Sequence, residues 1–399
     1  NWPERKEGGR MSRIYDVAVI GAGVIGAAVS YFTALDGADV ILLDKGDIAE
    51  GTSSKSDGNI LVCDKMPGFD SRLAKMSQDM YPQLEKELDY PIEWRRRGSL
   101  YLCETEEELE IARDYCSQMA AQGIPMRMMD QKDIQEDEPY LAKDLPGGIE
   151  TACDSSLYPI GLSYGYALTA RKLGAKLSLH NPVTAIAKEQ DFFIIQTEQG
   201  EIHARNVVNC AGVWSPSIGA MLGLSIPVSA RQGQILVSEQ TFPVARRKVH
   251  EFGYMLAKFG TGNYKRPVSE RVVRNGVAFV FEPTAADNFL IGSSRRFAGE
   301  DIRTDIEVMQ ALAERAIRFF PIIRDIKVIR AYSGLRPFTP DHLPIVSDTP
   351  VPGFFIAAGH EGDGIGLSAI TGQLISNLIA GREQPIDISP LSFGRFQQS

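Results

Sequence analysis

The sequence predicts an α/β protein built on a Rossmann-like dinucleotide-binding unit. Residues 15–26 are an apolar, strand-like run that enters a glycine turn with the spacing G-x-G-x-x-G, and the apolar stretch 27–35 that follows is helix-like. A second strand-like run, 38–43, ends in Asp44. Near the other end of the chain, residues 353–380 again have the order strand, glycine turn, helix. The first observation predicts the nucleotide-binding unit, and the second predicts that a distant part of the chain adds to it.

Each part of the first unit has a physical reason. Gly21 allows the tight turn, Gly23 lets the backbone approach a pyrophosphate, and Gly26 lets the helix pack closely on the strand. The helix N-terminus offers free N–H groups and about half a positive charge to the phosphates. The binding candidates of this turn are Gly21, Ala22, Gly23, Val24, Ile25 and Gly26.

Asp44 follows the second strand and can accept hydrogen bonds from ribose hydroxyls. Its charge would repel the 2′-phosphate of NADP. The motif itself leaves FAD and NAD open, and a glycine turn in some other α/β sheet is the alternative.

Length and composition set the class of protein. At 399 residues, the chain is expected to form two domains. A net charge of −9 argues against nucleic acid as a partner. The five cysteines lie far apart without a C-x-x-C pair, and the histidines show no ligand spacing, so a reduced cytoplasmic protein without a metal is expected.

The N-terminal residues and the lengths of the apolar runs predict how the chain relates to membranes. Residues 1–10 are polar and precede Met11, so they are expected to be a cloning remnant or a disordered end. We find no secretory signal pattern and no apolar run of about 18 residues, which predicts that no helix spans a membrane. Peripheral membrane contact stays open.

The segment 45–60 is rich in small and hydroxyl-bearing residues. Since it directly follows the ribose-binding strand, it is predicted to lie along the ligand, with a solvated surface loop as the alternative. Its binding candidates are Lys45, Ser53, Ser54, Gly58 and Asn59.

The middle of the chain mixes helices and strands. Helices are predicted over 70–90, 105–123 and 162–173, the second opening with a Thr105/Glu108 capping box, and two short strands are predicted within 92–102. Three short strands follow over 176–180, 181–186 and 192–196, and a hairpin around Gly200 leads to a buried strand and glycine turn over 206–215. The candidates here are Val183, Ala211, Gly212 and Trp214, with an ordinary strand and turn as the alternative.

Residues 226–294 are β-rich and punctuated by Gly and Pro, which is typical of an antiparallel sheet. The predicted strands cover 234–238, 253–258, 277–282 and 289–293, and a helix is predicted over 303–320.

The tail carries the second informative turn. A strand over 353–358 leads into a turn with glycines at 359, 362, 364 and 366, and then into a helix over 367–380. Gly359, Gly362, Gly364 and Gly366 would let a large planar or anionic ligand lie against the backbone, and the helix start favours negative charge.

These residues resemble a known family. The segments Gly21 to Gly26, Asn209 to Trp214, Gly334 to Pro337 and Gly359 to Ile365 make the chain similar to the FAD-dependent amino-acid and amine oxidoreductases of the D-amino-acid oxidase superfamily. This group includes glycine oxidase, sarcosine oxidase β-subunits and D-amino-acid dehydrogenases. The tail looks most like D-hydroxyproline and opine dehydrogenase subunits. Glycine oxidase typically has an arginine-containing turn where Glu361, Gly362 and Asp363 stand here.

The resemblance implies an interleaved architecture. The FAD domain would comprise 11–70, 150–215 and 330–390, and a substrate domain on a mixed, largely antiparallel sheet would comprise 71–149 and 216–329. FAD would occupy the Gly21 site, with Gly334, Arg336 and Ile365 as further contacts. Cys63 and Cys210 lie in flavin-side segments, but buried cysteines are common in cores, so non-covalent FAD is expected.

The resemblance also implies a reaction. The C–N bond of a small amino or imino acid, such as a D-proline-like or N-substituted amino acid, would be oxidised by hydride transfer to flavin N5, giving an imine. Arg336 would pair with the substrate carboxylate, with a structural salt bridge as the alternative. His360 and Glu361 are candidates for binding the substrate amine or shifting its pKa, with a structural histidine and an interface glutamate as the alternatives. Tyr254 and Tyr264 are further candidates for substrate contact, with buried packing as the alternative.

Three other functions stay open at this stage. The chain could be one subunit of a hetero-oligomeric opine- or sarcosine-type oxidoreductase that needs a partner. It could be an NAD-dependent dehydrogenase. It could also be a flavin-binding electron-relay subunit without its own substrate site.

Overall fold

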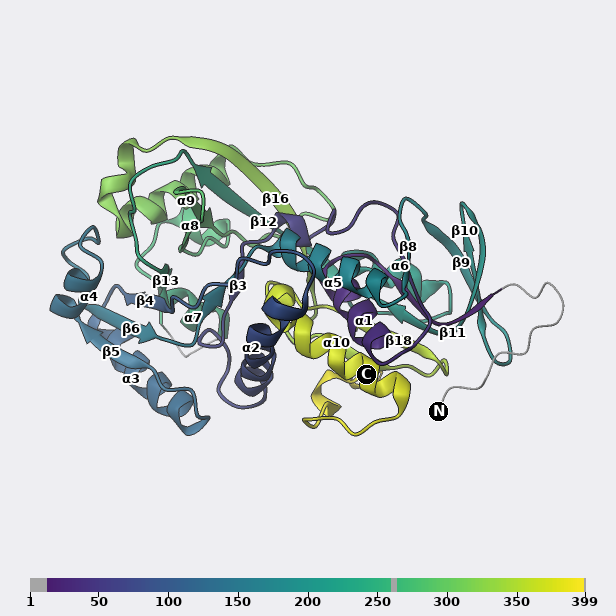
Figure 1. Cartoon of the computed structure of the whole chain (residues 1–399). Helices are drawn as coiled ribbons and strands as arrows, with labels where there is room; N and C mark the ends of the chain where they lie inside the picture. Colours follow the sequence, from purple (N-terminus) through teal and green to yellow (C-terminus); the bar gives the residue numbers. More distant parts are fainter. Residues whose placement is uncertain (1–12, 260–263, 398–399) are drawn as a thin grey trace.

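The computed structural model describes residues 13–259 and 264–397 and has two lobes, each built on an eight-stranded sheet (Figure 1). The prediction for residues 1–10 lies outside the described residues. Within them, we find no helix that is both long enough and apolar enough to cross a bilayer.

The first sheet is the predicted Rossmann-like sheet. Its central strands run parallel in the order β18-β11-β1-β2-β8, with β17 antiparallel at one edge, and β10 and β9 extend it as a hairpin from the start of β11. The strands are β1 (Ile14–Ile20), β2 (Val40–Leu43), β8 (Lys176–Ser178), β9 (Val183–Lys188), β10 (Phe193–Thr197), β11 (Gly200–Asn209), β17 (Ile345–Asp348) and β18 (Phe354–Ala358).

A helical layer covers this sheet. α1 (Val24–Leu35) packs between α5 (Pro159–Lys172) and α10 (Gly364–Ala380), and α10 also contacts α2 (Phe69–Glu87). β1, β2 and the first turn of α1 are almost entirely buried, because parallel strands covered on both faces need continuous apolar runs. Helix and strand predictions for this lobe are confirmed to within a few residues at each end.

The second sheet is mixed and largely antiparallel, as predicted; β13 and β4 form its parallel pair. Its strands, in spatial order, are β16 (Val328–Phe338), β12 (Ser229–Ser238), β15 (Phe289–Gly292), β14 (Val280–Pro283), β13 (Lys248–Glu251), β4 (Ser99–Cys103), β6 (Gly147–Thr151) and β5 (Arg127–Asp130). The helices of this lobe are α3 (Glu106–Ala121), α4 (Gln131–Asp137), α7 (Phe252–Phe259), α8 (Glu270–Arg274) and α9 (Ile306–Phe319). The short pair β3 (Asn59–Ile60) and β7 (Ser155–Ser156), and α6 (Ser215–Ala220), lie outside both main sheets.

Helix α3 begins as its sequence predicts. The Thr105 side chain accepts a hydrogen bond from the Glu108 amide at 3.1 Å, and Glu108 reaches back to the Glu104 amide at 2.6 Å. The return bond therefore goes one residue further back than in the usual capping box.

Two predicted strands are wrong. The stretch 253–258 is the helix α7, because Phe252, Met255 and Leu256 stand at helical spacing and all three bury in one core cluster. Before Gly98, only the single bridge from Arg95 to Ser156 forms, since the chain turns at Glu93, whose φ is +50°.

The predicted domain boundaries stay a prediction, but two of them fall inside strands of the second sheet. Residue 330 lies within β16 and residue 150 within β6. All strands of the first sheet lie in the ranges assigned to the FAD domain. The long strand β16 therefore carries the chain from one lobe to the other and ends beside the turn before α10, whose Glu361 amide bonds the Pro337 carbonyl.

Candidate active site

A cavity of about 810 Å³ lies between the two sheets. One side is formed by the carboxyl ends of β1, β2, β11 and β18, and the other by β12 and β16. In open α/β sheets, ligands bind outside the carboxyl ends of the strands, and the volume is that of a pocket for a sizeable organic ligand.

The first glycine turn fits a dinucleotide. Gly21 has a φ of +109°, and a Cβ there would lie 2.5 Å from the Cys210 carbonyl oxygen of the neighbouring strand. A Cβ on Gly26 would lie 1.8 Å from the Gly21 carbonyl oxygen. These two glycines are therefore required by backbone packing, and the turn they create opens the N-terminus of α1 to the cavity.

Asp44 is fixed at the end of β2. Its Oδ2 accepts the Ala22 amide at 2.5 Å, and its Oδ1 accepts the Gly46 amide at 2.8 Å. Nearby, Ser53 Oγ accepts the Val24 amide at 3.0 Å, which ties the loop after β2 to the first turn of α1. Carboxylate lone pairs not used by these bonds can accept from a ribose.

Most predicted cofactor residues line this one cavity. They are Gly21, Gly23, Val24, Ile25, Asp44, Lys45, Ser53, Asn59, Val183, Ala211, Gly212, Trp214, Gly334, Arg336, Gly362, Gly364, Ile365 and Gly366. The predicted residues that do not line the cavity are Ala22, Gly26, Ser54, Gly58 and Gly359. Trp214 holds Lys45 Nζ 3.5 Å from its ring centroid.

The turn before α10 is tied to a distant segment by a buried lysine. Lys65 Nζ lies 2.5 Å from Asp64 and 2.6 Å from Asp363, and its side chain is only 2% exposed. Burial acts to lower the pKa of Lys65, but the charges of Asp363 and Asp64 outweigh it and leave the pKa raised. Sequence reasoning missed this pair because its members stand 298 positions apart.

Arg336 enters the cavity from β16. Its guanidinium lies over the backbone of β12, where a Cβ on Gly233 would be 2.1 Å from Nη1, and a Cβ on Gly362 would be 3.7 Å from Nε. Nη1 donates to the Ser294 carbonyl at 2.8 Å. We find no carboxylate within 4 Å of this guanidinium in residues 13–259 and 264–397. Burial lowers the pKa of Arg336, against the opposing charges of Glu361 and Asp57.

Glu361 and His360 line the same cavity but have protein partners. Glu361 Oε1 accepts from Arg231 Nη1 at 2.6 Å, and Oε2 lies 3.0 Å from His342 Nδ1. His360 Nε2 lies 3.0 Å from Thr371 Oγ1 in α10, and burial lowers the pKa of His360 to about 3. His360 is therefore a neutral imidazole at pH 7.

Of the two tyrosine candidates, one lines the cavity and the other does not. Tyr254 lines the cavity under Arg295, whose guanidinium carbon is 4.2 Å from its ring centroid. Tyr264 is instead hydrogen-bonded to Glu108, away from the lining. Arg295 and His250, which also line the cavity, were missed, since neither stands in a recognisable motif.

The structure also joins two cysteines that the sequence separates by 90 positions. Cys63 Sγ and Cys153 Sγ are 3.1 Å apart, and with Asp154 they form a group whose ligand atoms lie within 4.8 Å of one another. Both Asp154 oxygens already accept hydrogen bonds, from the Val62 and Cys63 amides and from Ser99 and Tyr101. The pair is accordingly a hydrogen-bonded thiol pair.

Comparison with known proteins agrees with this site. Residues 16–378 match the sequence profile of a family described as FAD dependent oxidoreductase (DAO). The chain is 28% identical to glycine oxidase of Geobacillus kaustophilus, covering 96% of this chain and 98% of that protein. It is 24% identical to an opine oxidase subunit of Rhizobium meliloti, covering 96% and 97%.

The fold agrees as well. The crystal structure of the Geobacillus kaustophilus glycine oxidase superposes with a TM-score of 0.84 at 27% identity, covering 96% of this chain and 98% of that one. A family defined by FAD dependence excludes the NAD-dependent alternative, and the glycine turn, Asp44 and the cavity fit FAD. The chain belongs to the DAO family of FAD-dependent oxidoreductases.

Proposed function

We propose that this protein oxidises the C–N bond of a small amino or imino acid to an imine. The observation that carries the proposal is Arg336, a half-buried guanidinium that faces the cavity without an ion-paired carboxylate in the described chain. A cation that is partly removed from water favours an anion beside it, and a guanidinium fork suits the carboxylate of an amino acid. The glycine oxidase and the opine oxidase to which the chain is similar support the same substrate class.

Bound FAD would supply the hydride acceptor, and the protein would orient the substrate. Arg336 would bind the carboxylate, while Gly233 leaves room for its guanidinium. The N-terminus of α10, which lines the cavity at Gly364, would stabilise negative charge that develops on the cofactor.

A role of His360 and Glu361 in binding the substrate amine stays a prediction. The hydrogen bond between His360 and Thr371 favours a structural role for the histidine, and the ion pair between Glu361 and Arg231 favours one for the glutamate. Hydride loss requires a neutral amine but no strong base, so the proposed reaction does not depend on either residue.

An anaerobic flavin-reduction screen tests the proposal. The purified holoprotein is mixed with D-amino acids, cyclic imino acids and N-methyl amino acids, and the flavin absorbance near 450 nm is followed. Bleaching by at least one carboxylate-bearing amine is expected. If none bleaches the flavin while dithionite does, the proposal fails for the chain alone.

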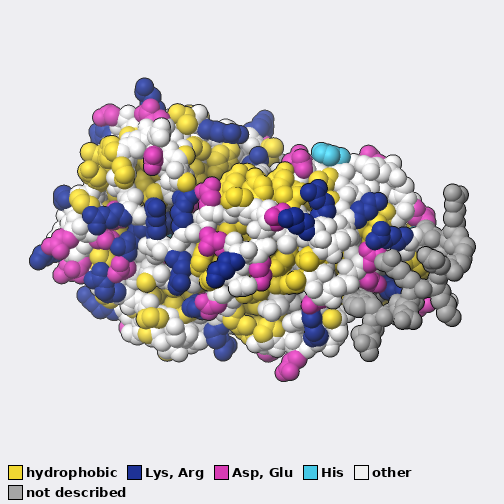
Figure 2. Space-filling view, in the orientation of Figure 1, with side chains coloured by type: hydrophobic (Ala, Val, Ile, Leu, Met, Phe, Trp, Pro, Cys, Tyr) yellow, Lys and Arg dark blue, Asp and Glu magenta, His cyan; other side chains and the backbone are white. Residues whose placement is uncertain are grey.

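A second candidate is that the chain acts only with a partner subunit. One relative is itself named as a subunit, and apolar side chains are exposed on the lobe that contains α8, α9 and β16 (Figures 1 and 2). Those that are 60% or more exposed are Val273, Phe297, Ile302, Ile306 and Ile329. Flavin bleaching that appears only after a co-expressed partner is added would favour this candidate.

Two finer predictions belong to the same proposal. FAD is held non-covalently, so acid precipitation should leave the yellow colour in the supernatant. The protein is cytoplasmic, which cell fractionation would test.

A further inference from the structure

The cavity contains a second guanidinium that the proposed reaction does not use. Arg295 lines it together with Arg336, and its side chain is 15% exposed. Arg295 Nε and Nη1 are buried and, among the described residues, have no hydrogen-bond partner. The nearest ion pair is long, since Arg295 Nε lies 3.8 Å from Glu361 Oε1.

Glu361 is the acid whose charge acts most strongly on both arginines, but it is already engaged by other residues. Its Oε1 is 2.6 Å from Arg231, and its Oε2 is 3.0 Å from His342. Asp57 also lines the cavity, and its charge acts on Arg336 without an ion pair. Burial, and after it the positive charge of Arg336, lower the pKa of Arg295 to about 10. The described residues therefore leave positive charge near Arg295 and Arg336 that protein carboxylates do not fully neutralise.

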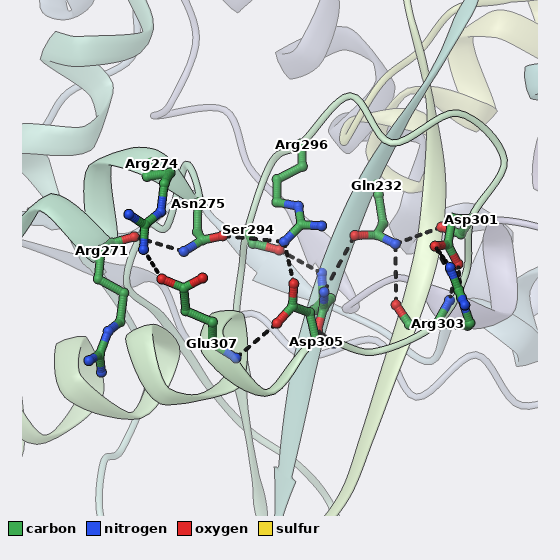
Figure 3. A network of polar contacts seen from close by, with 11 residues as sticks. Gln232, Arg271, Arg274, Asn275, Ser294, Arg296, Asp301, Arg303, Asp305 and Glu307 are labelled. Atoms are coloured by element: carbon green, nitrogen blue, oxygen red, sulfur yellow. Dashed lines mark hydrogen bonds and ion pairs between the residues drawn. The ribbon is translucent and has the colours of Figure 1, made fainter.

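The backbone on both sides of Arg295 is held by hydrogen bonds. Before it, the Ser294 carbonyl accepts from Arg336, and Ser294 Oγ accepts the Gln234 amide at 3.0 Å. After it, Arg296 exchanges two backbone hydrogen bonds with Gln232 of β12. Figure 3 shows Ser294, Arg296 and Gln232 within the polar network around this segment.

The same network fixes the loop that continues from there. Arg296 Nη1 lies 2.6 Å from Asp305 Oδ2, and Gln232 Nε2 donates to the Asp301 carbonyl at 2.6 Å. Asp305 in turn caps α9 by accepting the Glu307 amide. The second guanidinium is thus positioned by a fixed segment rather than by a free loop, as pre-organised binding groups are.

We propose that Arg295 binds a second carboxylate of the substrate, so that the substrate is an amino or imino acid with two carboxylates. This inference rests on the proposed function. Arg336 would take the carboxylate next to the reacting C–N bond, and Arg295, which stacks on Tyr254, would take the distal one. Arg295 is then a specificity-determining residue.

Matched substrate pairs test this. The distal carboxylate of N-(2-carboxyethyl)glycine is replaced by a methyl group in N-propylglycine, and D-glutamate and D-norvaline form a second such pair. In at least one pair, the dicarboxylate should reduce the flavin with a kcat/KM about 10- to 100-fold higher, the usual effect of one charge-assisted hydrogen bond. A preference for the monocarboxylate in both pairs, or no preference in either, overturns the inference and leaves the proposed function standing.

Arg295→Gln should remove that preference by lowering the dicarboxylate kcat/KM about 10- to 100-fold and the monocarboxylate value by less than about 3-fold. Arg303→Gln is the control, because that side chain is 87% exposed on the same loop. Equal losses on both members of a pair would contradict the assignment.

A measurement without a variant keeps the test independent of folding. Adipate should perturb the flavin spectrum of the wild-type holoprotein at concentrations about 10-fold lower than pentanoate does. Equal affinities overturn the inference. If no amine reduces the flavin, the proposed function fails, while the adipate titration still decides whether the cavity binds two carboxylates.

Discussion

Arg336 and Gly233 lie on paired strands, and the guanidinium of one occupies the space that a side chain on the other would fill. In the ladder between β12 and β16, Gly233 stands opposite Gly334, two residues from the pair formed by Arg231 and Arg336. A Cβ on Gly233 would be 2.1 Å from Arg336 Nη1. The absence of a side chain at Gly233 therefore sets where the predicted carboxylate-binding group lies.

Gly233→Ala should displace this guanidinium without unfolding the protein, because the atom it meets is the end of a flexible side chain. We expect KM for the amine substrate to rise about 10-fold, as for a misplaced charge-assisted bond, with bound FAD unchanged. Ser229→Ala, at an exposed position on the same strand, is the control. Steady-state kinetics and the ratio of flavin to protein absorbance measure both effects, and an unaltered KM would rule out this positioning role.

Arg336→Lys keeps the charge but removes the planar fork. KM should rise about 10- to 100-fold for a carboxylate-bearing amine, because a lysine cannot make the bidentate pair. FAD should stay bound. Arg330→Lys, an exposed position on the same strand, should leave KM unchanged. If KM is the same in Arg336→Lys as in the wild type, Arg336 does not bind the substrate carboxylate.

The sequence could predict those parts of the site that are formed by residues close together along the chain. The turn at Gly21 and the turn before α10 are each a strand, glycines and a helix within about 25 residues, and both line the cavity. The prediction of Arg336 as a substrate-binding residue rests on the resemblance of the segment Gly334 to Pro337 to the family, and not on a physical pattern in the sequence.

The parts that could not be predicted depend on contacts between distant residues. Lys65 and Asp363 form their ion pair only after α10 packs beside the segment before α2. Arg295 has no motif, and its position follows from the Gln232 and Asp305 network. The short apolar run of α7 fits the period of a strand as well as that of a helix, so the sequence predicts a strand there. The burial of Phe252, Met255 and Leu256 in one core cluster decides for the helix.

The thiol pair gives a prediction on reactivity. The hydrogen bond from Cys63 lowers the pKa of Cys153, which is half-buried, while the other four thiols are buried and have raised pKa values. Since the thiolate is the nucleophile, iodoacetamide at pH 8 should modify Cys153 first, as read by peptide mapping. Cys63→Ala should slow this alkylation. First modification at another cysteine would contradict the assigned pair.

Glu108 gives a prediction on the pH dependence of stability. It is 1% exposed, and burial raises its pKa from 4.5 to about 7. The hydrogen bonds from Tyr264 and the Glu104 amide lower this pKa, but their effect is smaller than that of burial. A raised carboxyl pKa means that the folded state holds the proton more tightly than the unfolded state. Its contribution to the free energy of unfolding is therefore complete below pH 4.5 and is lost as the pH rises through about 7.

The size of that loss is about 3 kcal/mol, from roughly 1.4 kcal/mol per pKa unit. Glu108→Gln mimics the protonated acid, so the thermal midpoint of the variant minus that of the wild type should increase between pH 5 and pH 8. Comparing the two proteins at each pH cancels the other titrating groups, including the buried His250 and His360, whose lowered pKa values act in the opposite direction below pH 6.5. Glu107→Gln, exposed on the same helix, should show no such change. A difference that stays constant with pH would mean that Glu108 is ionised across the whole range, and that its bonds to Tyr264 and Glu104 outweigh its burial.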